Sequence, residues 1–174
     1  MKKKLKKKKG VLFWITGLSG SGKTSLALKI KKQINNLYGP TVHFSGDQIR
    51  KIFSLRGYSA NDRIKIGFMY SRLFKFITDQ NINILFSGIV LIKKVRKWNK
   101  KNIKNYIEIY IDSKIRSILI NKKKNLYKKQ RANIVGIDIA ADIPNNPDII
   151  IKNDFSLSIN DLSKELLHKI NSKL

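Results

Sequence analysis

The chain has 174 residues, enough for one α/β domain with a buried core and too few for two domains of ordinary size. It contains no cysteine and only two histidines, which excludes disulfides, thiolate metal sites and histidine-based metal sites. The net charge of +26 suggests nucleic acid as a partner, but lysine is spread through the whole chain. We therefore expect a soluble enzyme without a functional nucleic-acid surface.

The N-terminal segment, Met1 to Lys9, is mostly lysine and lacks the apolar core of a signal peptide or a membrane span. We expect a cytoplasmic protein without a membrane partner. Residues 1–10 are expected to form a disordered, lysine-rich tail, and residues 11–174 a single domain.

Apolar runs alternate with helical patterns, as in a parallel sheet covered by helices on both faces. In chain order we expect a strand at 11–16, a helix at 24–37, a strand at 41–44, helices at 47–55 and about 61–79, a strand at 82–86, a helix at 93–102, a strand at 106–111 and a helix at 113–120. Residues 121–147 are charged and then punctuated by proline, and a loop of that length is usually functional. A strand at 148–151 and a helix at 159–170 follow. The sequence thus predicts an α/β fold with three layers.

Between the first strand and the first helix, residues 17–24 read GLSGSGKT and fit the pattern GxxxxGK[ST]. Glycines in such a phosphate loop let backbone N–H groups approach phosphate oxygens, and the following helix presents its positive end. Lys23 is expected to face the β- and γ-phosphates, and Thr24 to offer its hydroxyl to Mg²⁺. The residues expected to bind the nucleotide are Gly17, Ser19, Gly20, Ser21, Gly22, Lys23, Thr24 and Ser25.

Ligands of open parallel sheets bind beyond the carboxyl ends of the strands, and Asp47 follows the second expected strand. Arg50 lies one helical turn later on the same face. A carboxylate here can orient or deprotonate a substrate hydroxyl, and a guanidinium can clamp a phosphate. The alternative is that Asp47 only caps the following helix, and beside a phosphate loop we favour the catalytic role. Asp62 and Arg63 allow the same two interpretations, stabilisation of a helix end or anion binding.

Several motifs in the same order resemble the adenylylsulfate kinase family. Besides the phosphate loop, residues 45–50 read SGDQIR against the family's DGDNIR, and Asp62-Arg63 follows. Residues 126–129 match the family's LYKK, and residues 136–147 match its GID...P.NP pattern without a gap. The resemblance runs from about residue 11 to residue 151. It implies a P-loop NTPase-type fold and transfer of the γ-phosphate of ATP to the 3′-hydroxyl of adenosine 5′-phosphosulfate.

The resemblance also assigns roles. It makes Lys23 and Asp47 catalytic, the first neutralising the transferring phosphoryl group and the second positioning or deprotonating the acceptor hydroxyl. Residues 121–147 would close as a lid that keeps water from ATP. A homodimer is an expectation from the resemblance alone. The residues expected to bind the acceptor nucleotide are Asp47, Arg50, Arg63, Ile89, Lys128, Lys129 and Arg131.

The sequence departs from the family pattern on the acceptor side. Ser45 replaces the first DGD aspartate, Ile66 and Phe68 replace an asparagine and an arginine, and Val90 replaces a serine. The residues that face ATP are unchanged, so we expect the acceptor contacts to differ and the ATP contacts to be kept.

Other segments, such as Asp79-Gln80-Asn81 and Trp98-Asn99, look more like a branch of these kinases found with surface-polysaccharide genes. In that branch the acceptor can be another nucleotide, such as cytidine diphosphoramidate, phosphorylated on the same hydroxyl. Trp98 and Tyr106, each taken singly, are expected to be packing residues. A third interpretation is an inactive, nucleotide-gated protein that binds a polyanion through its lysines.

Overall fold

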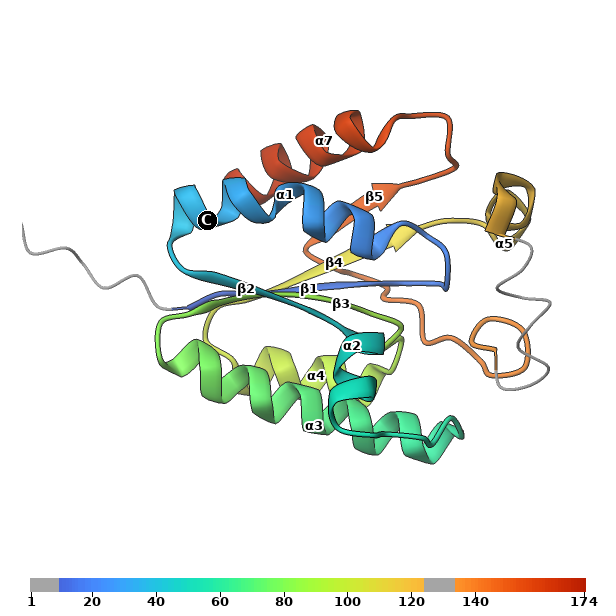
Figure 1. Cartoon of the computed structure of the whole chain (residues 1–174), viewed down its shortest axis with the longest axis horizontal. Helices are drawn as coiled ribbons and strands as arrows, with labels where there is room; N and C mark the ends of the chain where they lie inside the picture. The colour runs from blue at the N-terminus through green and yellow to red at the C-terminus, as the bar shows by residue number, and fades with distance from the viewer. Residues whose placement is uncertain (1–9, 124–133) are drawn as a thin grey trace, which may run out of the picture.

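The computed structural model describes residues 10–123 and 134–174, and the strands in this part of the chain form one parallel sheet of five strands. The strands are β1 (Leu12–Gly17), β2 (Thr41–Ser45), β3 (Asn83–Gly88), β4 (Tyr106–Asp112) and β5 (Ile149–Lys152). Their order across the sheet is β2-β3-β1-β4-β5, and every neighbouring pair is parallel. The carboxyl ends of the strands therefore lie along one edge, on the right in Figure 1.

Helices cover both faces of the sheet, so the predicted three-layer α/β architecture is confirmed (Figure 1). One face carries α1 (Lys23–Tyr38) and α7 (Ile159–Asn171), and the other carries α2 (Gly46–Ile52), α3 (Ala60–Asp79) and α4 (Lys93–Asn102). The short α5 (Ile115–Ile118) and the π-helical turn η1 (Leu119–Lys123) follow β4. No helix in the described part of the chain is both long and apolar enough to cross a membrane.

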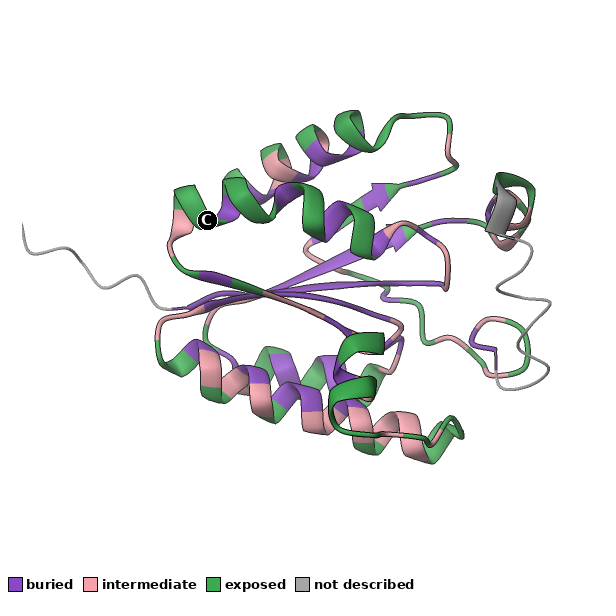
Figure 2. Cartoon of the chain, viewed as in Figure 1, coloured by how far each residue is buried: buried purple, intermediate pink, exposed green. Residues whose placement is uncertain are grey.

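Strand β1 is buried along its whole length (Figure 2). Its side chains alternate between the two helical layers. Phe13 and Ile15 pack in the core under α1 and α7, whereas Leu12 and Trp14 pack in the core above α3 and α4. All four are fully buried. The first strand is therefore shielded from water by both helical layers, as is β3.

Two helices differ from the expectation by more than one residue at an end. The helix expected at 47–55 ends at Ile52, because the backbone N–H of Leu55 turns back to the carbonyl of Arg50 and Ser54 adopts a φ of 51°. The helix expected at 113–120 begins at Ile115, after Lys114 as its N-cap residue, and continues as η1. Both differences follow from backbone geometry that side-chain periodicity does not report.

A buried ion pair ties α4 to β4. Nε of Arg96 lies 2.6 Å from Oε1 of Glu108, and both side chains are close to fully buried. Nη1 of Arg96 donates to the carbonyl of Asp142 at 2.7 Å, and the Asp142 carboxylate accepts from the backbone N–H of Lys93 at 3.0 Å. Burial raises the pKa of Glu108, although the Arg96 charge acts in the opposite direction. The chain leading into β5 is thereby fixed to the start of α4.

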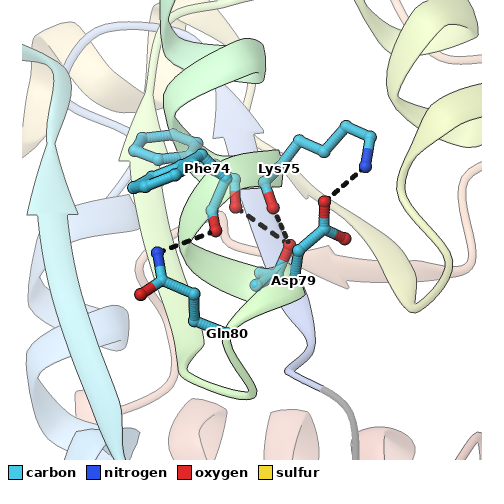
Figure 3. Close-up of polar contacts among 6 residues, drawn as sticks. Phe74, Lys75, Asp79 and Gln80 are labelled. Carbon is cyan, nitrogen blue, oxygen red and sulfur yellow. Dashed lines mark hydrogen bonds and ion pairs between the residues drawn. The ribbon is translucent and has the colours of Figure 1, made fainter.

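We predict that Glu108→Ala lowers the free energy of unfolding by about 3 kcal/mol, because it leaves the Arg96 guanidinium buried without its partner. The matched control is the exposed pair of Lys75 and Asp79 on α3 (Figure 3), where Asp79→Ala should cost less than about 1 kcal/mol. Urea unfolding of both variants measures the difference. Equal losses would contradict a structural role for the buried pair.

Candidate nucleotide-binding site

The phosphate loop, residues 17–24, connects β1 to α1 at the carboxyl edge of the sheet (Figure 1). A Cβ on Gly17 would lie 2.7 Å from the carbonyl oxygen of Ile111, which is too close for any other residue. Gly22, with a φ of 91°, is the N-cap residue of α1 in the left-handed region. Glycine is therefore required where the loop leaves the strand and where it enters the helix.

Asn153, which directly follows β5, holds the loop from the far side. Its Nδ2 donates to the carbonyl of Ser21 at 3.1 Å, and its own backbone N–H donates to the carbonyl of Asp112 at 2.8 Å. The side chain is buried, so this contact is shielded from water. Sequence reasoning missed Asn153, because the residue belongs to no motif and lies far along the chain from the loop.

Lys23 folds back onto the loop. Its Nζ donates to the carbonyl of Leu18 at 2.5 Å and lies 3.3 Å from Oγ of Ser21. Burial lowers the pKa of Lys23 to about 7, and the Asp47 carboxylate opposes that shift. An anion of high charge placed on the loop would favour the protonated amine.

Asp47 lies in the first turn of α2, directly after β2. Ser45 is the N-cap residue of this helix, because its Oγ accepts from the N–H of Gln48 at 3.1 Å and the Gln48 side chain accepts from Ser45 in return. The alternative that Asp47 is the cap is therefore wrong. Tyr70 on α3 donates its hydroxyl to the carbonyl of Gly46 at 3.2 Å, and burial raises the pKa of Tyr70 to about 12.

Arg50 and Arg63 meet around the ring of Tyr58. Nη1 of Arg50 donates to the carbonyl of Gly57 at 2.7 Å, and its guanidinium lies 4.5 Å from the centroid of the Tyr58 ring. Nε of Arg63 donates to the carbonyl of Tyr58 at 3.0 Å, and its guanidinium lies 5.7 Å from the same centroid. Asp62 forms a capping box with Ser59, so it stabilises the start of α3. Of the pair Asp62 and Arg63, only Arg63 therefore remains a candidate for anion binding. Tyr58 is a residue of the site that the sequence did not reveal.

The phosphate loop and these side chains line one cavity of about 640 Å³. Among the described residues that line it, Lys23, Arg50 and Arg63 are cationic, whereas Asp47 is acidic. A net positive cavity of this size suits a polyanionic small molecule. The predicted site residues that line it are Ser19, Gly20, Gly22, Lys23, Thr24, Ser25, Asp47, Arg50, Arg63 and Ile89.

The other predicted residues lie elsewhere. Gly17 and Ser21 are absent from the described lining of the cavity and support the loop from beneath, Gly17 against Ile111 and Ser21 against Asn153. Lys128, Lys129 and Arg131 lie outside the described residues, as does most of the charged part of the expected lid.

The departures from the family pattern fall in two places. Ile66 and Val90 line the cavity, where they present aliphatic surface. Phe68 instead packs edge-on against Trp98, with ring centroids 6.5 Å apart, in the core between α3 and α4. Trp98 and Tyr106 are packing residues, as expected.

A central strand that ends in a phosphate loop, a sheet in this order and a second charged group across the cavity define a phosphate-loop kinase. The sequence profile of the adenylylsulphate kinase family matches residues 9–152. The chain belongs to this family and is a phosphotransferase with a hydroxyl acceptor.

The relatives that this chain resembles include kinases named for two different substrates. The chain is 28% identical over 163 residues to the cytidine diphosphoramidate kinase of Campylobacter jejuni, a match that covers 91% of this chain and 95% of that protein. It is 30% identical over 157 residues to the adenylyl-sulfate kinase of Clostridium kluyveri, covering 87% and 79%. It is 32% identical over 154 residues to that of a Synechococcus strain, covering 83% and 85%.

Solved structures agree with the fold. The Mycobacterium tuberculosis APS kinase in complex with AMPPNP and APS superimposes with a TM-score of 0.82 at 25% identity, over 94% of this chain and 98% of that one. The shikimate kinase of Bacteroides thetaiotaomicron reaches a TM-score of 0.63 at 12% identity and shares the fold alone, over 92% and 98% of the two chains.

We predict that ATP binding at pH 8 takes up about one proton, because the bound phosphates raise the lowered pKa of Lys23 and protonate its amine. Calorimetry in buffers of different ionisation enthalpy measures this uptake. Lys23→Arg, whose side chain stays charged, should bind ATP without it, whereas the exposed Lys29→Met should behave like the wild type. A wild-type binding enthalpy that does not depend on the buffer would contradict the prediction.

Proposed function

We propose that this protein transfers the γ-phosphate of ATP to the ribose 3′-hydroxyl of a small nucleotide. The observation that carries the proposal is the shared cavity, which has the phosphate loop on one side and Asp47, Arg50 and Arg63 on the other. Two anionic substrates can meet there without water between their reacting groups. We retain closure of residues 121–147, with Lys128, Lys129 and Arg131, as part of this proposal.

The donor side holds ATP. The loop amides and the N-terminal end of α1 face the phosphates, and Lys23 neutralises the charge that develops on the transferring group. Magnesium binds through one or two protein oxygens and several phosphate or water oxygens. The Thr24 hydroxyl at the cavity wall fits that requirement, and the described residues contain no cluster of three or more His, Cys, Asp or Glu side chains that would hold a different kind of metal. When bound, Mg²⁺ would stabilise negative charge on the β- and γ-phosphates.

The acceptor side holds the second nucleotide. Asp47 accepts the proton of the attacking hydroxyl or orients that hydroxyl toward the γ-phosphate. Arg50 and Arg63 bind the anionic 5′ end, and their contacts to Gly57 and Tyr58 hold both guanidinium groups in place before substrate arrives. These assignments rest on the positions of the side chains around the cavity and on the family membership.

We predict that Asp47→Asn lowers kcat by about 100-fold or more, because an amide cannot accept the hydroxyl proton. The affinity for ATP should stay within about twofold of the wild type, since the phosphate loop is untouched. Steady-state kinetics and calorimetry check the two quantities. Asp79→Asn, at the exposed end of α3, is the control. Unchanged turnover in a variant that still binds ATP would remove Asp47 from the mechanism.

For the acceptor, adenosine 5′-phosphosulfate and cytidine diphosphoramidate are the two candidates. We rank cytidine diphosphoramidate first. Its support is that Ile66 and Val90 present aliphatic surface to the cavity at positions where the adenylylsulfate kinase pattern has asparagine and serine. A polar acceptor network built on those two groups is thereby removed. The Campylobacter jejuni relative also matches over more of both chains than the adenylyl-sulfate kinases above.

An acceptor comparison at equal concentrations tests this order. We expect kcat/KM for cytidine diphosphoramidate to exceed that for adenosine 5′-phosphosulfate by at least about tenfold. The double variant Ile66→Asn, Val90→Ser restores the polar groups and should shift the ratio of the two kcat/KM values toward adenosine 5′-phosphosulfate. The control Ile52→Asn, at an exposed position, should leave this ratio unchanged. A wild-type preference for adenosine 5′-phosphosulfate would reverse the order, and no transfer to either nucleotide would contradict both candidates.

A further inference from the structure

Three polar side chains form a chain of contacts that runs from β2 through β3 to the start of α1. Nε2 of His43 lies 3.0 Å from Oγ of Ser87, and that oxygen lies 3.2 Å from Oγ1 of Thr24. His43 pairs with Leu85 in the sheet, two residues before Ser87, so both side chains lie on the face that α1 covers. Ser87 is 2% exposed and therefore has little water to replace either partner.

The chemistry of Thr24 fixes the direction of the protons in this chain. A hydroxyl that offers a lone pair to Mg²⁺ keeps its proton and must donate it to another acceptor. Oγ of Ser87 is within hydrogen-bonding reach. Ser87 then donates its own proton onward, and Nε2 of His43 receives it when the imidazole is neutral with its proton on Nδ1.

The surroundings of His43 favour that neutral form. Burial between β2 and α1, and to a smaller extent the charge of Lys31 on α1, lower the pKa of His43. His43 is absent from the described lining of the cavity, so it reaches the nucleotide side only through Ser87.

We propose that His43 is a positioning residue of the Mg²⁺·ATP site. By accepting the Ser87 proton it leaves the Ser87 oxygen to accept the Thr24 proton, so that a Thr24 lone pair would remain available to Mg²⁺. Sheet geometry and two hydroxyl groups thus connect the edge strand β2 to the first residues of α1. This inference rests on the proposed role of Thr24 as a Mg²⁺ ligand.

The test compares the affinity for ATP with and without Mg²⁺, measured by calorimetry. In His43→Phe the gain in affinity from Mg²⁺ should shrink by about tenfold, with the affinity for metal-free ATP unchanged. His43→Gln, whose side-chain oxygen can accept the same proton, should recover most of the gain. Ser87→Ala should reduce the gain in ATP affinity from Mg²⁺ as much as His43→Phe does. The control variant His168→Phe, at an exposed position, should show the same gain as the wild type.

A second measurement needs no variant. Nitrogen NMR of the wild-type protein should show the His43 proton on Nδ1 and a bare Nε2. A proton on Nε2, or equal Mg²⁺ gains in wild type and His43→Phe, would overturn the inference while leaving the proposed kinase intact. If the wild type gains no affinity from Mg²⁺, the proposed role of Thr24 fails instead.

Discussion

Strand β1 pairs with β3 on one side and β4 on the other, and the position of the site depends on these two pairings. The register places Thr16 opposite Gly88 and Tyr110, so three central strands end together beneath the phosphate loop. The parallel arrangement brings their carboxyl ends to a single edge, which is where open α/β sheets bind ligands. Any shift of β1 in the sheet would therefore move the loop relative to both the Ser87 hydroxyl on β3 and Asn153 after β5.

The cationic side chains of the cavity are buried or held in place, unlike most of the other cationic side chains that the structure describes. Most of the lysines in the described part of the chain lie at exposed positions, where they are solvated. Lys23 is buried, and Arg50 and Arg63 are held by backbone carbonyls and by the Tyr58 ring. Side chains held in this way lose little entropy when an anion binds. In the proposed function, a few fixed cations within a strongly basic protein recognise two phosphate-bearing substrates.

Local signals in the sequence were sufficient to predict the helices and strands and half of the described residues that line the cavity. Glycines at fixed spacing located the phosphate loop, and the carboxylate and guanidinium predicted after β2 line the same cavity as this loop. The contacts that support them are not local. Asn153 reaches Ser21 across 132 positions and His43 reaches Ser87 across 44, so no periodicity reports either contact. The sequence left open that Asp47 caps α2, because Ser45 and Asp47 are both good N-cap residues and only the backbone geometry separates them.

The central claim is that both substrates meet in this cavity and that phosphate reaches one hydroxyl. Phosphorus NMR of the product formed from ATP and the accepted nucleotide tests it most directly. The account predicts a new phosphomonoester resonance coupled to the ribose H3′ proton, and no such product from a 3′-deoxy acceptor. Release of inorganic phosphate alone, or equal transfer to the 3′-deoxy acceptor, would contradict it.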